Sequence, residues 1–140
     1  MPESIIGKLD KWFNQIDRRE TVFIAEKKPK LASLFQKWID HKYRVRIISS
    51  KEQLVKEMNY STDYLLIDRY FADNLEELLE SIKMDYPNIS IILLTGVEPE
   101  IDQLELEFDD YIVKPADKSR IIDKIESADI KEMERGLMED

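Results

Sequence analysis

The sequence lacks cysteine entirely and contains a single histidine, His41, among its 140 residues. Without cysteine, the chain cannot form disulfides, zinc ribbons, Cys-ligated clusters or a thiol nucleophile. One histidine cannot build a multi-histidine metal centre, so any metal ion must be held by oxygen ligands. Glycine is scarce as well, and three glycines cannot assemble the Gly-rich phosphate loops of dinucleotide-binding or Walker-type enzymes.

Long apolar runs and excess positive charge are also missing. No run approaches the roughly 18 residues that cross a membrane, and the amino terminus carries no secretory signal pattern. We therefore expect a cytoplasmic protein without membrane association. The 21 Lys and Arg residues are outnumbered by 30 Asp and Glu residues, for a net charge of −9. This charge repels polyphosphate backbones, so we expect no direct binding to nucleic acid.

Short apolar runs alternate with helical patterns along most of the chain. The runs cover residues 22–25, 43–48, 64–67, 89–94 and 111–113, and the helical patterns cover 31–40, 51–59, 75–85, 98–105 and 119–134. This regular alternation predicts an α/β fold with a parallel sheet covered on both faces. We predict a flavodoxin-like doubly wound five-stranded sheet with strand order 2-1-3-4-5.

An extra helix is predicted before the sheet domain. Apolar residues from Ile5 to Ile16 recur at spacings near 3.6, which is typical of an amphipathic helix. The predicted organisation is this helix at 1–20, the sheet domain at 21–135 and a short tail at 136–140. We expect the helix to cover an apolar patch on its own domain or on a second copy. Within the sheet domain, we predict core positions at Leu31, Phe35 and Trp38, which share helical spacing.

Polar side chains follow several of the predicted strands. Glu26 and Lys27 follow the first strand, Asp68 the third, Thr95 the fourth and Lys114 the fifth. In an open α/β sheet, functional groups gather beyond the carboxyl ends of the strands, next to the point where the strand order reverses. Alone, each residue could serve as a helix cap or a solvated loop residue. Together they predict a functional crevice that contains a carboxylate, a hydroxyl and an ammonium group.

These residues lie in segments that resemble the receiver domain of two-component response regulators. The resemblance spans about residues 21–130 and is carried by VFIAEKKP at 22–29, DYLLID at 63–68, IILLTG at 91–96 and DDYIVKPAD at 109–117. The last two segments are the most specific. VEPEID followed by FDDYIVKP is also similar to receivers common in haloarchaeal regulators.

The resemblance implies a role for each matching residue. Asp68 matches the aspartate that accepts a phosphoryl group from a histidine kinase. Thr95 matches the Ser/Thr that binds this group and carries the switch, and Lys114 matches the lysine that ion-pairs with it. Tyr111 matches the aromatic switch on the face formed by the helix at 98–105, the last strand and the last helix. The implied function is signal relay rather than turnover catalysis, with a histidine kinase or other signalling protein as partner. A homodimer could form through this face or through the predicted amino-terminal helix.

The metal site departs from the family pattern. Receivers place two acids after the first strand, whereas this chain has Glu26 and Lys27 there. Only Glu26 and Asp68 then remain as side-chain ligands, and we expect Mg²⁺ binding to be weak or absent. The Lys27 ammonium would stabilise ionised Asp68 if it lies in the pocket. Alternatively, its flexible stem reaches into solvent and leaves the two carboxylates to bind Mg²⁺.

Two other functions remain open at this stage. The first is a pseudo-receiver, a protein-interaction module that neither binds magnesium nor accepts phosphate, and Lys27 favours it. The second is a flavodoxin-like enzyme or flavin protein that uses the same crevice. The charged loop EKKPK at 26–30 counts against a flavin, because it lacks the Ser, Thr and Gly residues of a phosphate-binding loop.

Overall fold

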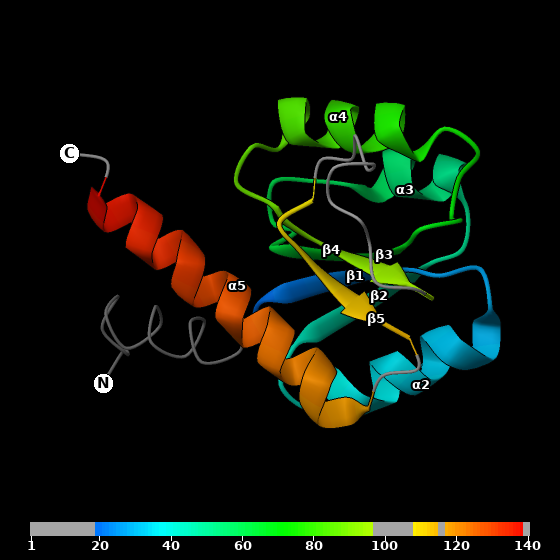
Figure 1. Cartoon of the computed structure of the whole chain (residues 1–140). Helices are drawn as coiled ribbons and strands as arrows, with labels where there is room; N and C mark the ends of the chain where they lie inside the picture. The colour runs from blue at the N-terminus through cyan, green and yellow to red at the C-terminus, as the bar shows by residue number, and fades with distance from the viewer. Residues whose placement is uncertain (1–18, 97–107, 115–116, 139–140) are drawn as a thin grey trace, which may run out of the picture.

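The fold is a single parallel sheet with helices on both faces (Figure 1). The computed structural model describes residues 19–96, 108–114 and 117–138, and only the backbone from residue 129 onward. The strands are β1 Thr21–Ala25, β2 Arg44–Ile48, β3 Tyr64–Asp68, β4 Ser90–Thr95 and β5 Asp110–Val113. Their order is β2-β1-β3-β4-β5, and all four pairings are parallel. This confirms the predicted flavodoxin-like topology.

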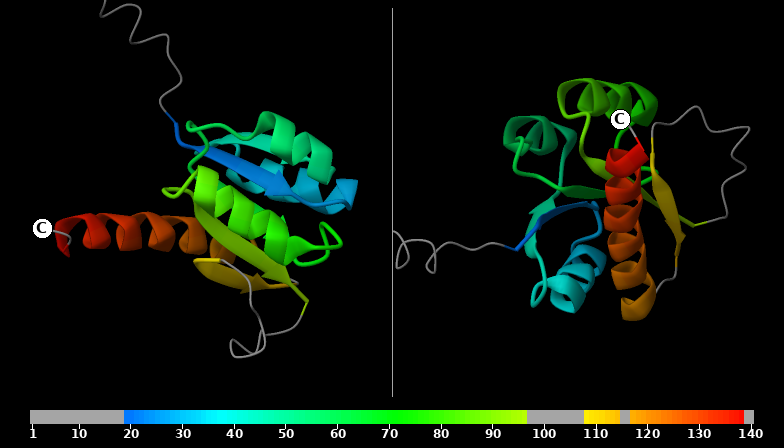
Figure 2. Two further views of the ribbon diagram at one scale, coloured as in Figure 1. Left: turned by 90° about the horizontal axis from the view of Figure 1, so that it is seen from above. Right: turned by 90° about the vertical axis from the view of Figure 1, so that its left-hand side faces the viewer.

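Four helices lie in the described part of the chain. They are α2 Pro29–Ile39, α3 Lys51–Glu57, α4 Leu75–Asp85 and α5 Lys118–Met138. Helices α2 and α5 cover one face of the sheet, and α3 and α4 cover the other (Figure 2). The carboxyl-terminal part of α5 continues past the sheet, and the helix ends four residues later than the predicted 134. Of the predicted helix at 1–20, all but the last two residues lie outside the described residues, as does the whole predicted helix at 98–105.

Residues that favour the start of a helix follow closely after the ends of β1, β2 and β3. Pro29 occupies the first turn of α2, where its missing N–H costs no hydrogen bond. The Ser50 hydroxyl accepts a hydrogen bond of 3.1 Å from the Gln53 amide at the start of α3. The Asn74 side chain accepts one of 3.2 Å from the Glu77 amide at the start of α4. These signals keep the connections after β1, β2 and β3 short, and so position the residues that leave each strand.

The core forms two layers, one on each face of the sheet. Leu65 and Ile67 of β3 pack against α3 and α4, whereas Leu66 packs against α2 and α5. Because both faces are covered, residues 64–67 of β3 and all residues of β4 are buried, which explains their uninterrupted apolar runs. Within residues 19–96, 108–114 and 117–138, no helix combines the length and apolar character that crossing a membrane requires.

The edge strand β2 carries an ion pair whose contribution to the stability of the fold depends on pH. Arg46 hydrogen-bonds to Glu57 at the end of α3, and Gln53 donates to the same carboxylate at 2.7 Å. The hydrogen bond from Arg46, followed by that from Gln53, lowers the pKa of Glu57 below its ordinary value. A lowered folded-state pKa stabilises the fold above the unfolded pKa, and this contribution is lost as the pH falls through the folded pKa.

We expect Arg46→Gln to raise the pKa of Glu57 toward its ordinary value, because the principal donor to the carboxylate is lost. The measurement is a pH titration of the Glu57 carboxyl carbon by NMR. Arg44→Gln, on the same strand, is the matched control and should leave the Glu57 titration unchanged. An ordinary Glu57 pKa in the unmodified protein would contradict this account.

Candidate functional site

Four of the predicted site residues meet at the carboxyl edge of the sheet. The Lys114 ammonium lies 2.5 Å from Asp68 Oδ1 and 3.6 Å from Glu26 Oε2. The backbone N–H of Lys114 donates to the carbonyl of Thr95 at 2.7 Å, which holds the end of β4 against the residue that follows β5. The parallel register of β1, β3, β4 and β5 therefore brings two carboxylates and an ammonium group together, with the backbone of Thr95 beside them.

The two carboxylates differ in their surroundings. The side chain of Glu26 is only 2% exposed; its Oε1 accepts a hydrogen bond from the Lys28 amide at 3.2 Å. Its Oε2 is buried without a hydrogen bond and is compensated by the nearby Lys114 ammonium. Asp68 is bound at both oxygens, because Oδ2 accepts from the Tyr70 amide at 3.0 Å while Oδ1 pairs with Lys114. Lys114 is thus the cation shared by both acids.

Thr95 and Tyr111 lie on neighbouring strands close to this cluster. Thr95 is completely buried at the end of β4, where it pairs in register with Val113. Tyr111 is partly buried and packs against the core on the α3 and α4 side, with the Lys124 ammonium 5.7 Å from its ring centroid. Thr95 therefore lies at the site. Tyr111 lies two residues before Val113, which is the partner of Thr95 on β5. Their switching roles remain predictions.

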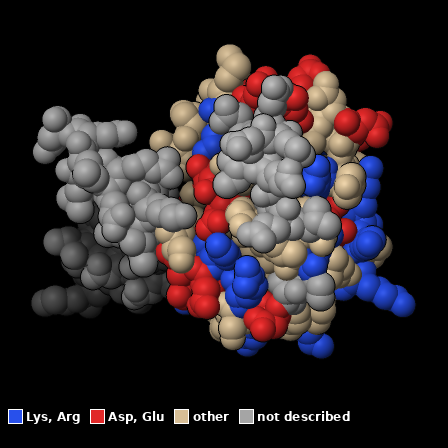
Figure 3. Space-filling model, in the orientation of Figure 1, with Lys and Arg blue, Asp and Glu red and all other residues tan. Residues whose placement is uncertain are grey.

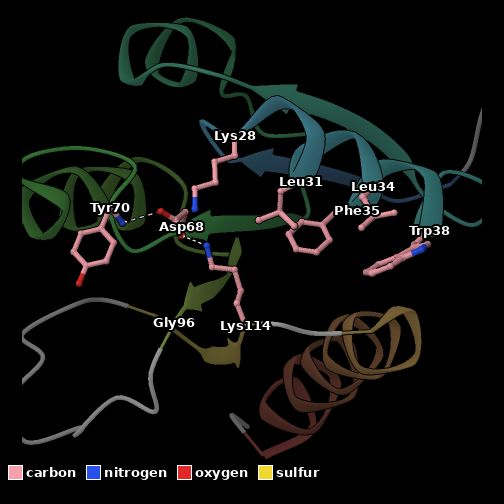
Figure 4. A pocket seen from close by; sticks show the side chains of 9 residues that line it. All are labelled: Lys28, Leu31, Leu34, Phe35, Trp38, Asp68, Tyr70, Gly96 and Lys114. Atoms are coloured by element: carbon pink, nitrogen blue, oxygen red, sulfur yellow. Dashed lines mark hydrogen bonds and ion pairs between the residues drawn. The ribbon is translucent and has the colours of Figure 1, made fainter.

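The structure places a second lysine, Lys28, at the site, and this residue was not among the predicted site residues. Lys27 and Lys28 are both exposed. Lys27 agrees with the solvent-directed alternative, whereas Lys28 lines a cleft and points toward Asp68 (Figure 4). Pro29 is the feature of the sequence that could have indicated the conformation of Lys28, because proline favours extended backbone at the residue before it. Lys28 has this conformation, with φ −81° and ψ 106°. The chain bends at Lys27, and Lys28 lines the cleft whereas Lys27 does not.

The described residues offer a magnesium ion few side-chain ligands. They contain no group of three or more His, Cys, Asp or Glu side chains that could hold a metal. The carboxylates that are present, Glu26 and Asp68, already share the Lys114 ammonium, and Lys28 adds a second positive charge beside them. Mg²⁺ prefers six oxygen ligands at close range and is repelled by neighbouring cations. Instead, both carboxylates of this pocket pair with Lys114.

The cleft continues from these charged groups along α2. It has a volume of about 580 Å³ and is lined by Lys28, Leu31, Leu34, Phe35, Trp38, Asp68, Tyr70, Gly96 and Lys114. Of the three predicted core residues of α2, Phe35 is buried, whereas Leu31 and Trp38 are only partly buried and contribute to the cleft wall.

Comparisons with known structures agree with this architecture. A CheY-like receiver domain protein from Methanospirillum hungatei has a TM-score of 0.71 at 24% identity, covering 83% of this chain and 98% of that one. A two-component response regulator from Clostridium difficile has a TM-score of 0.70 at 15% identity, covering 79% of this chain and 95% of that one. The chain has the fold of response regulator receiver domains, as its motifs predicted.

At the level of sequence, a curated relative is a Haloferax volcanii protein described as "Putative transcriptional regulator". It is 26% identical over 109 residues, which cover 76% of this chain but only 19% of that protein. The matched region therefore spans about a fifth of the relative. A scan of protein-family models finds no match to this chain.

Proposed function

We propose that this chain is a receiver module that relays a two-component signal in the cytoplasm, with Asp68 accepting a phosphoryl group from a histidine kinase. The observation that carries the proposal is the Lys114 ammonium, 2.5 Å from Asp68 Oδ1 at the carboxyl edge of the sheet. The receiver fold of the structural neighbours supports the broader assignment to signalling. In this role the chain is a signalling partner rather than a turnover enzyme.

The proposed chemistry is a single phosphoryl transfer. A carboxylate oxygen of Asp68 forms a bond to phosphorus, and the bond from phosphorus to the donor breaks, with the electron pair leaving on the donor. The adjacent Lys114 ammonium neutralises charge on the transferred oxygens, which is the main requirement of this reaction. Thr95 would then bind the phosphoryl group, and Tyr111 would shift the population of the partner-binding face.

We further propose that lysines take over much of the charge neutralisation in this pocket. Lys114 forms ion pairs with both Glu26 and Asp68, and Lys28 points toward Asp68 without forming an ion pair with it. A pocket that is neutral without a divalent ion has little electrostatic need for one. Mg²⁺ binding is therefore expected to be weak, and phosphorylation slow.

A second function is favoured by the same ion pairs. Both oxygens of the Asp68 carboxylate are already bound, since Oδ2 accepts from the Tyr70 amide and Oδ1 accepts from Lys114. A pseudo-receiver that binds signalling partners without phosphorylation would have a site of this kind, because the acceptor is occupied by its own neighbours. Whether Asp68 can be phosphorylated distinguishes the receiver from the pseudo-receiver.

We expect incubation with acetyl phosphate to add one phosphoryl group to the protein, slowly and to a similar extent with and without Mg²⁺. Intact mass spectrometry measures the addition. Asp68→Asn removes the acceptor and should abolish it, while Asp73→Asn, an exposed acid five residues later, is the matched control and should not. No addition to folded protein over hours would favour the pseudo-receiver, and rapid addition only with Mg²⁺ would refute the lysine-based neutralisation.

A further inference from the structure

We propose that the cleft beside Asp68 binds a small amphipathic anion, a molecule with one carboxylate and an apolar body of the size of a medium-chain fatty acid. The anionic group would pair with Lys28, and the apolar body would lie along α2. This ligand site goes beyond phosphorylation at Asp68 and does not depend on it.

The dimensions and lining of the cleft match such a ligand. Its volume of about 580 Å³ lies within the range of small-molecule sites. One end holds the charged groups of Lys28, Asp68 and Lys114, and the rest is lined by apolar side chains of α2 (Figure 4). A ligand with one polar end and one apolar end is therefore complementary to it.

The apolar wall comes from a stripe of α2 that the sheet does not cover. Ala32, Phe35 and Ile39 bury the sheet-facing side of the helix. Leu31, Leu34 and Trp38 follow helical spacing on an adjoining stripe; Leu34 is 40% exposed, and Leu31 and Trp38 are partly buried. Trp38 also packs at a tilt against the Phe35 ring, with centroids 5.8 Å apart. Covering this stripe would remove apolar surface from water, which is the driving force for the ligand's apolar body.

The charge at the other end selects an anion. Lys114 is committed to Asp68 and Glu26, but no carboxylate of the described residues forms an ion pair with the Lys28 ammonium, which points into the cleft. Lysines 27 and 30 are exposed nearby, and the first turn of α2 contains no acid. Figure 3 shows the resulting gathering of basic side chains at its right-hand edge, over the start of α2. This end of an acidic protein is therefore locally positive.

Octanoate is the probe for this site, compared with octyltrimethylammonium, which has an alkyl chain of similar length and the opposite charge. NMR titration of the isotope-labelled full chain should show octanoate shifting the amides of Lys28, Leu31 and Gly96 and the indole N–H of Trp38. Octyltrimethylammonium should bind more weakly. Equal binding of both probes, or octanoate shifts confined to other parts of the chain, would overturn the proposal.

Variants test each end of the cleft separately. Lys28→Gln should weaken octanoate binding by about tenfold, because one charge-assisted contact is lost. Lys27→Gln makes the same change of net charge at the neighbouring exposed lysine and should weaken binding by less than about twofold. Leu34→Asp should also weaken binding, while Val55→Asp on α3, also at an exposed position, should not. Equal losses for Lys28→Gln and Lys27→Gln would refute a specific anion contact.

The ligand and the phosphoryl donor are expected to compete if Asp68 is the acceptor, because both would occupy the charged end of the cleft. Octanoate should then slow the mass gain from acetyl phosphate in the unmodified protein. This arm rests on the proposed function, whereas the NMR titration does not. A protein that binds octanoate but is never phosphorylated would sustain the ligand site and reject phosphorylation.

Discussion

Replacing Lys114 with methionine is expected to lower the free energy of unfolding by about 3 kcal/mol. The substitution removes the cation shared by Glu26 and Asp68, whose side chains are only 2% and 14% exposed. Glu26 Oε2, which has no hydrogen bond, would keep a buried charge with no compensation. Because Lys114 and Asp68 retain some contact with water, we expect the lower end of the range for broken buried pairs. Urea unfolding followed by circular dichroism measures the change.

Two further variants show whether this loss comes from the unpaired acids. Lys118→Met replaces an exposed lysine near the start of α5 and should change stability by less than about 0.5 kcal/mol. Adding Glu26→Gln to Lys114→Met removes the buried charge and should recover about 1 kcal/mol. If Lys114→Met is as stable as Lys118→Met, the ammonium does not hold the two carboxylates, and the electrostatic account of the site fails with it.

Replacing Asp109 with alanine is expected to lower the free energy of unfolding by about 3 kcal/mol. Asp109 Oδ2 accepts hydrogen bonds from the Ile91 amide at 2.7 Å and from the Lys83 ammonium at 2.9 Å. One side chain thus joins the residue before β5 to β4 and to the end of α4. Its removal leaves the Ile91 N–H without this acceptor and leaves Lys83 with the carbonyl of Ile89, 2.6 Å away. Thermal and urea unfolding measure the loss.

The matched control is Asp123→Ala, which removes an exposed acid from α5 and should be close to neutral. Hydrogen exchange adds a local test, because the amides of β5 should lose protection in Asp109→Ala more than those of β1. If both variants unfold at the same urea concentration, the contacts of Asp109 do not stabilise the edge of the sheet.

The sheet was predictable because its strands are encoded locally. The run at 64–67 is apolar throughout since β3 is covered on both faces, and a strand of this kind can be identified without knowing its neighbours. The edge strand β5 is shorter and less apolar, yet the alternation of strands and helices still places it. Strand order followed from the preference for short, right-handed crossovers rather than from any single residue.

The sequence by itself determined which chemical groups leave the ends of the strands, because parallel strands bring their carboxyl ends to one edge. That reasoning selected Glu26, Asp68, Thr95 and Lys114, which the structure brings together. The tertiary structure alone decided where the side chains point and which groups pair. It exposes Lys27, turns Lys28 toward Asp68 and leaves part of α2 as a cleft wall, because these outcomes depend on backbone direction and on neighbours distant in sequence.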